Sequence, residues 1–165
     1  MANYHIAITD NLRKTGYTSN KQRNVNGTWR RINGLKKQYA SKGFPDAVLE
    51  RIYTREDSSN ADEETLAVEQ VTHVLMGSKG LHAGNQEIHG DGWTEIFEVS
   101  REQLTGYFGK AIQVCKQLNW NIEKIVNWLE AYCTKKFGVI SWSEYCYGEP
   151  REHGNPLKTA LESRG

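Results

Sequence analysis

The sequence predicts an α+β fold with about five helices, a C-terminal αα-hairpin as its core, and a few short, antiparallel strands. Residues 3–9 alternate between two faces, as a half-buried strand does, and residues 101–137 carry two helical apolar patterns joined by a short turn. A chain of 165 residues can bury a core within one domain. We therefore expect a single globular domain over residues 1–150, with a basic N-terminal third, and a polar C-terminal tail over residues 151–165.

The basic stretch that follows the first strand allows two backbone conformations. The Asn-Gly pairs at 26–27 and 33–34 are typical of hairpin turns, because both residue types tolerate positive φ. A helix from about Trp29 to Lys42 competes with this, and Gly43 would then be the left-handed residue after its end. The helix fits better, because four apolar side chains would share one of its faces. These are Trp29, Ile32, Leu35 and Tyr39.

The segments on either side of this stretch predict a loop and two further helices. Residues 14–27 are rich in Asn, Ser and Gly, which predicts a basic loop with little apolar surface. A short helix is predicted from Pro45 to about Arg55, because proline suits the first turn of a helix. The acidic residues 62–64 favour the start of another helix, which would end near Met76.

The second half of the chain contains the clearest helix signals. Residues 77–92 include five glycines and predict a loose segment, and residues 93–99 predict a strand. Ser100 and Gln103 match a capping box, so a long helix should start at Arg101. Asn121 is expected to cap the last long helix.

The charge distribution points to an anionic partner. The first 55 residues contain eleven Lys or Arg against three Asp or Glu, although the net charge of the chain is only +1. Basic side chains neutralise phosphates and release counterions, while exposed aromatic rings can stack on bases. This predicts a non-enzymatic protein that binds nucleic acid or a nucleoprotein through residues 13–42, with little base specificity. The expected contacts are Arg13, Lys14, Lys21, Arg23, Trp29, Arg30, Arg31, Lys36, Lys37 and Lys42.

The charge pattern does not distinguish DNA, RNA and a protein partner. A chain without a Walker loop, a GxSxG elbow or a GxGxxG fingerprint also suits a protein–protein inhibitor or adaptor, of the phage or mobile-element accessory type. Such a protein would act on a nucleic-acid-processing complex, and its bipolar charge would serve that contact.

A third hypothesis is a small metal-dependent hydrolase or nuclease. If residues 86–91 are extended, Glu87, His89 and Asp91 lie on one face, where they could hold a divalent metal or provide a general base. His82 could join them. No His-x-x-x-His pair or HExxH motif supports this site, so we predict no metal and no cofactor.

The expected compartment is the cytoplasm. Cys115, Cys133 and Cys146 form an odd count without CxxC spacing, which favours reduced thiols. The N-terminal residues lack the pattern of a secretory signal, and no apolar run is long enough for a membrane span. We therefore expect no membrane partner.

Overall fold

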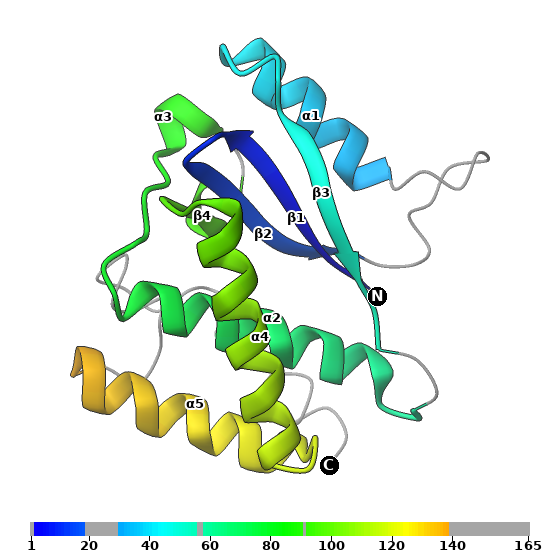
Figure 1. Cartoon of the computed structure of the whole chain (residues 1–165), viewed down its shortest axis with the longest axis vertical. Helices are drawn as coiled ribbons and strands as arrows, with labels where there is room; N and C mark the ends of the chain where they lie inside the picture. Colours follow the sequence, from blue (N-terminus) through cyan, green and yellow to red (C-terminus); the bar gives the residue numbers. More distant parts are fainter. Residues whose placement is uncertain (1, 19–29, 56–57, 91, 139–165) are drawn as a thin grey trace.

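A computed structural model describes residues 2–18, 30–55, 58–90 and 92–138, and within them it confirms the α+β fold. These residues form five helices and a four-stranded antiparallel sheet (Figure 1). The helices are α1 (Arg30–Ser41), α2 (Ala61–Gly77), α3 (Gln86–His89), α4 (Arg101–Gln117) and α5 (Ile122–Phe137). The predicted tail over residues 151–165 lies outside the described residues.

The sheet places α1 on one face and α2 on the other. Its strands are β1 (Ala2–Thr9), β2 (Leu12–Thr18), β3 (Val48–Tyr53) and β4 (Ile96–Phe97), in the spatial order β3-β1-β2-β4. Tyr4 and the two alternate residues after it pack against the apolar side of α1. Asn3 points the opposite way, and its side-chain amide donates a hydrogen bond of 2.8 Å to the Thr65 carbonyl of α2.

Two predicted elements are wrong in the N-terminal third. Residues 14–18, predicted as loop, belong to strand β2, which pairs with β1 so that Gly16 lies opposite Tyr4. The predicted helix over residues 45–55 is replaced by β3, which pairs with the other edge of β1. The backbone groups of both segments find their partners in β1, and this long-range pairing outweighs the local preferences that suggested loop and helix.

The other helix predictions are confirmed. The helix predicted from about Trp29 to Lys42 is present as α1, and Gly43 after it has the expected left-handed φ of +96°. The predicted capping box is present at α4, where Ser100 Oγ accepts from the Gln103 amide at 3.1 Å and Gln103 Oε1 accepts from the Ser100 amide at 2.9 Å. Asn121 Oδ1 caps α5 by accepting from the Lys124 amide at 3.0 Å. The predicted strand over residues 93–99 is shorter: a 3-10 turn, η2 (Trp93–Glu95), precedes the two residues of β4.

The C-terminal helices α4 and α5 form the main core together with α2. Apolar side chains from the three helices meet in one buried cluster. Its members include Leu66, Val71, Phe108, Ala111, Cys115, Ile125, Leu129 and Cys133. The two cysteines are buried, and neither forms a disulfide within the described part of the chain. Among the described residues, no helix combines the length and the apolar character that a bilayer crossing requires.

Candidate functional site

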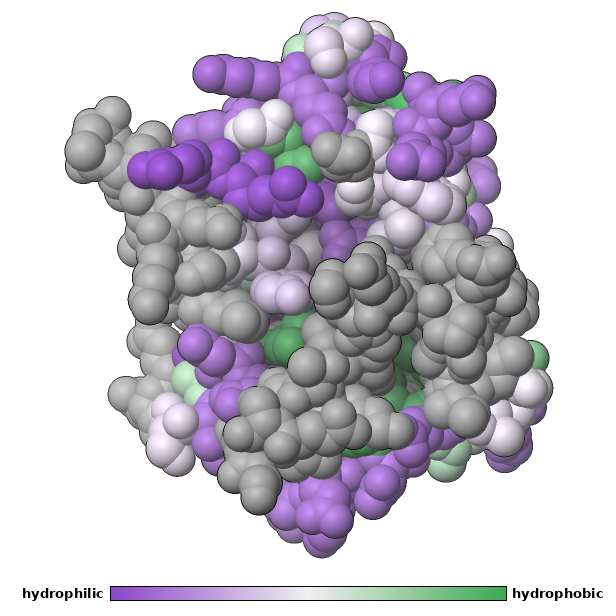
Figure 2. All heavy atoms as spheres, turned by 180° about the vertical axis from the view of Figure 1, so that it is seen from behind, coloured by the Kyte–Doolittle hydropathy of each residue, from purple (hydrophilic) through white to green (hydrophobic). Residues whose placement is uncertain are grey.

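The exposed charged residues of α1 are all basic. Arg30, Arg31, Lys36 and Lys37 are all exposed, and the helix contains no acidic residue. We call these four residues the basic face. Figure 2 shows hydrophilic side chains gathered over the end of the molecule that carries α1. A pocket of about 440 Å³ is hollowed into this face, and Arg30, Arg31, Gly34, Leu35 and Gln38 line it. Two of the four cations, Arg30 and Arg31, therefore line a pocket, and the two lysines lie outside it.

The other predicted contact residues are distributed differently. Lys42 is exposed just beyond α1. Arg13, in contrast, is only 5% exposed: its Nε lies 2.7 Å from Glu50 Oε1, and its Nη1 donates to the Val99 carbonyl at 2.9 Å. Its donors are used inside the protein, so Arg13 is not part of the basic surface. Lys21, Arg23 and Trp29 lie outside the described residues.

Lys14 is fully buried, on the face of the sheet that packs against α1. Its Nζ lies 2.5 Å from Glu95 Oε2 and 3.3 Å from the Gly92 carbonyl oxygen. Burying an ammonium group is costly unless it is paired, and Glu95 supplies the opposite charge from the residue that precedes β4. The same Nζ lies 5.9 Å from the centre of the Tyr4 ring.

Tyr4 connects this buried ion pair to the basic face. Burial raises the pKa of its hydroxyl above the usual range, with a further rise from Glu95, whereas a hydrogen bond with Arg31 opposes that rise. The hydroxyl is therefore protonated at neutral pH and can donate. A Cβ on Gly16 would lie only 2.6 Å from Tyr4 Oη and 3.1 Å from Glu95 Oε2, so the close approach of these groups requires glycine at that position.

Tyr39 brings a second buried hydroxyl from α1 to the same place. The residue is fully buried, and its hydroxyl has no hydrogen-bond partner among the described residues. Burial raises its pKa to about 12, and the positive charge of Lys14 acts in the opposite direction. A buried hydroxyl without a partner is uncommon in folded proteins.

Glu69 and His73, one turn apart on α2, reach the cluster from the other side of the sheet. The His73 Nε2 atom lies 3.0 Å from the Thr15 carbonyl oxygen and 3.5 Å from Glu69 Oε1. Because a carbonyl can only accept, Nε2 carries the proton. Burial lowers the pKa of His73 to about 4, so the ring is neutral at pH 7, although Glu95 raises that pKa. The negative charge of Glu69 also raises the pKa of Tyr4.

These groups lie on both faces of the sheet around β1 and β2 and act on one another electrostatically, and we call them the Tyr4 cluster. Its members are Tyr4, Lys14, Arg31, Tyr39, Glu69, His73 and Glu95. Buried titratable groups with shifted pKa values gather at functional sites more often than elsewhere. Arg31 can clamp a phosphate, Tyr4 can donate a proton, and Glu69 can accept one. The described part of the chain contains no group of three His, Cys, Asp or Glu arranged to hold a metal ion.

The extended conformation that the predicted row of Glu87, His89 and Asp91 requires is not found at residues 86–89. Residues 86–89 are the helical turn α3 and not an extended segment, so Glu87 is exposed while His89 is buried. The His89 Nδ1 atom accepts from the Asn85 amide at 2.9 Å, and the ring stacks on Phe44. His82 packs between aromatic rings instead of joining them. Asp91 lies outside the described residues.

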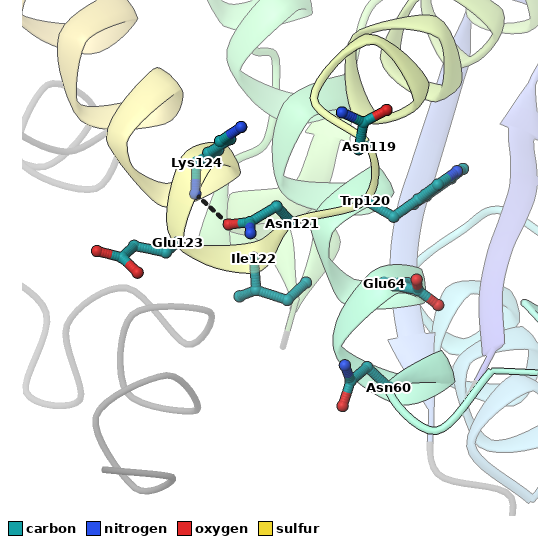
Figure 3. A pocket seen from close by; sticks show the side chains of 8 residues that line it. All are labelled: Asn60, Glu64, Asn119, Trp120, Asn121, Ile122, Glu123 and Lys124. Carbon is teal, nitrogen blue, oxygen red and sulfur yellow. Dashed lines mark hydrogen bonds between the residues drawn. The ribbon is translucent and has the colours of Figure 1, made fainter.

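A second hollow lies between the first turns of α2 and α5 (Figure 3). Its volume is about 560 Å³, and no residue of the Tyr4 cluster lines it. Its lining comes from α2, from the turn between α4 and α5, and from the start of α5.

Sequence reasoning missed most of the Tyr4 cluster. Tyr4 and Tyr39 were assigned to apolar faces, which is correct for their rings but overlooks their hydroxyls. The sequence contained one signal: Tyr4 alternates with two isoleucines on a buried face. A buried tyrosine hydroxyl usually needs a hydrogen-bond partner. Glu69 carried a weaker signal, as a carboxylate among the inward positions of an apolar helix.

Comparisons with known proteins do not indicate a function for this chain. Searches with protein-family models, among curated proteins and among solved structures found no match to this chain.

Proposed function

We propose that this protein binds nucleic acid with the basic face of α1 and hydrolyses a phosphodiester bond at the Tyr4 cluster. One observation supports this above all: Arg31 belongs to both places. Arg31 is an exposed residue of α1, and its guanidinium is hydrogen-bonded to the buried hydroxyl of Tyr4. A phosphate attracted to the basic face would therefore contact Arg31, whose guanidinium adjoins the proposed acid Tyr4.

Binding would rest on the exposed cations. Arg30, Lys36 and Lys37 neutralise backbone phosphates, and the release of counterions supplies the affinity. Contacts of this kind position the strand without reading its bases. The pocket on this face, lined in part by the two arginines, accommodates one phosphate group between them.

Hydrolysis would use Arg31, Glu69 and Tyr4 in separate roles. The guanidinium of Arg31 neutralises the non-bridging oxygens as negative charge develops on them. Water attacks phosphorus, and its proton passes by way of Glu95, which lies beside the Tyr4 hydroxyl and acts on His73, to the Glu69 carboxylate on the other face of the sheet, while the bond from phosphorus to the leaving sugar oxygen breaks. The Tyr4 hydroxyl protonates that oxygen and regains its proton from Glu69 through solvent. The products are a phosphate monoester and a free sugar hydroxyl.

Two features set conditions on this chemistry. The Tyr4 side chain is only 1% exposed and the Lys14 ammonium is paired with Glu95, so a phosphate can approach only after side chains of the cluster move. A divalent ion would find few protein ligands here and would complete its shell with water and phosphate oxygens, as Mg²⁺ commonly does.

Cleavage of end-labelled single-stranded DNA, duplex DNA and RNA, with Mg²⁺ or with EDTA, tests the proposal. Tyr4→Phe and Glu69→Gln should each lower the cleavage rate by at least about 100-fold, since proton transfer contributes that much. Tyr107→Phe is the matched control, because it removes a hydroxyl from a half-buried ring on α4. Wild-type cleavage by folded Tyr4→Phe and Glu69→Gln proteins would refute the proposed chemistry.

Binding without cleavage is the second candidate, and the closure of the cluster favours it. The Lys14 ammonium is fully buried and already paired, which is the arrangement of a structural ion pair. Fluorescence anisotropy across a salt series separates the candidates. Two results together support binding alone. Binding should weaken steeply with salt and be lost in the Arg30→Glu, Lys37→Glu double variant, and no cleavage should occur with any added divalent metal ion. No binding at low salt would leave the basic face to an acidic protein partner.

A further inference from the structure

The pocket between α2 and α5 is built from polar side chains around one large aromatic ring. Figure 3 shows Glu64 on α2 with Asn60 just before that helix, Asn119 and Trp120 in the turn before α5, and Asn121 at the start of α5. Ile122, Glu123 and Lys124 complete the lining. The volume of about 560 Å³ is large enough for a planar ring system.

A buried carboxylate oxygen in this pocket lacks a hydrogen bond. Glu64 is 5% exposed, and its Oε2 has no hydrogen-bond partner in the described part of the chain. The Arg55 Nε atom lies 3.7 Å away, too far to donate, and Nε itself also has no acceptor there. The two groups form an ion pair without a hydrogen bond, and buried polar atoms without hydrogen bonds are costly, so the fold favours a ligand that donates N–H groups to Glu64.

The turn that presents Trp120 is strained. Asn119 and Trp120 have φ values of +56° and +54°, in the left-handed region that side chains other than glycine seldom adopt. Amide hydrogen bonds to α4 hold this turn: Trp120 donates to the Cys115 carbonyl at 2.8 Å and Asn119 to the Lys116 carbonyl at 2.9 Å. Such strain is concentrated at ligand sites, where it fixes a side chain in a useful place.

The Trp120 indole already stacks with a flat group, the guanidinium of Arg55. The Arg55 guanidinium lies 3.8 Å from the centre of the Trp120 ring. A cation at this position makes the ring part of a stack of flat groups, and flat aromatic ligands extend such stacks. The pocket thus combines a stacking ring, an acceptor without a donor, and amides that can both donate and accept.

We propose that this pocket binds an unpaired guanine base. Unpaired bases are recognised by stacking and by hydrogen bonds along the edge that would otherwise form a base pair. Guanine carries two adjacent donors on that edge, N1–H and the N2 amino group, which match the two oxygens of the Glu64 carboxylate. The Asn119 amide can serve the guanine O6 acceptor. The proposal rests on the proposed function only for the source of the base, namely a bound nucleic-acid strand.

Calorimetric titration of the full chain with the four ribonucleoside monophosphates tests this pocket directly. Guanosine monophosphate should bind, and uridine monophosphate should bind at least tenfold more weakly, because a well-placed pair of hydrogen bonds discriminates by about that factor. Glu64→Gln should weaken the guanosine monophosphate complex at least tenfold, and Glu98→Gln, an exposed carboxylate elsewhere, should leave it unchanged. Asn119→Gly keeps the positive φ without strain, so it remains folded, and should weaken binding severalfold.

Each result supports or overturns the guanine site. Equal affinity for guanosine and uridine monophosphates, or unchanged affinity in folded Glu64→Gln and Asn119→Gly proteins, overturns it. Glu69→Gln separates this site from the proposed hydrolysis, because that variant should still bind guanosine monophosphate. Guanosine monophosphate binding without any cleavage would refute the hydrolase alone, and cleavage without nucleotide binding would refute the guanine pocket alone.

Discussion

Lowering the pH from about 7.5 to about 5 should destabilise the protein through two buried, neutral histidines. His5, on β1, is 4% exposed and packs edge-on against Phe108 at 4.8 Å between ring centres. Burial lowers its pKa to about 3, and the positive charge of Arg51 lowers it further in the same direction. His73 is buried on α2, where burial lowers its pKa to about 4.

The size of the effect follows from proton linkage. In the unfolded chain both rings take up a proton below a pKa of about 6.5, whereas the folded protein holds them neutral until the pH falls to about 4 for His73 and about 3 for His5. The contribution of the two neutral histidines to stability is therefore fully present above pH 6.5 and is lost as the pH falls below that value. At pH 5 each histidine costs about 2 kcal/mol, and the two together about 4 kcal/mol. That is a large part of a typical total of about 5–15 kcal/mol.

Urea unfolding at half-unit intervals of pH measures this directly. The free energy of unfolding should fall with a slope approaching two protons between about pH 6 and pH 4.5, or about 2.7 kcal/mol per pH unit. His82 and His89, whose pKa values burial also lowers, act in the same direction. His73→Gln should remove close to one proton from the slope. A free energy that stays constant from pH 6.5 to pH 5 would refute the argument that these rings are buried and neutral.

Two further predictions concern packing around the Tyr4 cluster and the loop beside it. Glu95→Gln leaves the buried ammonium of Lys14 without an opposite charge and should lower the free energy of unfolding by about 3 kcal/mol, measured by denaturant titration; an unchanged value would mean that the pair is not buried. Gly84→Ala drives a Cβ into the Trp93 carbonyl oxygen and should lower the melting temperature by several degrees, whereas Gly106→Ala, in open space on α4, should raise it slightly. Equal effects of the two glycine substitutions would contradict this packing.

Local signals in the sequence were sufficient for the C-terminal helices. A capping box, an asparagine cap and apolar positions at helical spacing act within a few residues, so they can be read without knowledge of the fold. The same holds for α1, where the apolar side chains of Ile32, Leu35 and Tyr39 define a buried face. The extra hairpin signal from the Asn-Gly pair at 33–34 was weaker than this periodicity.

The strands of the N-terminal third depended on tertiary structure. Apolar residues at positions 48, 49, 52 and 53 fit one face of a helix as well as they fit a strand, and Pro45 strengthened the wrong choice. The structure decides for β3 because β1 offers it a pairing edge, with Ile52 opposite Tyr4. The same strand pairs with β2 on its other side and converts part of a predicted loop into sheet.

The candidate site was decided almost entirely by tertiary structure. From sequence, Arg13 and Lys14 are two cations of a basic stretch, whereas their opposite charges, Glu50 and Glu95, lie 37 and 81 residues further along the chain. Only folding brings those carboxylates to them and brings Arg31 to the Tyr4 hydroxyl. The sequence by itself determined the fold class, the C-terminal helices and the exposed charge of α1, because these depend on neighbouring residues. The burial of charges and the order of the strands depend on residues far apart in the chain, so only the tertiary structure decided them.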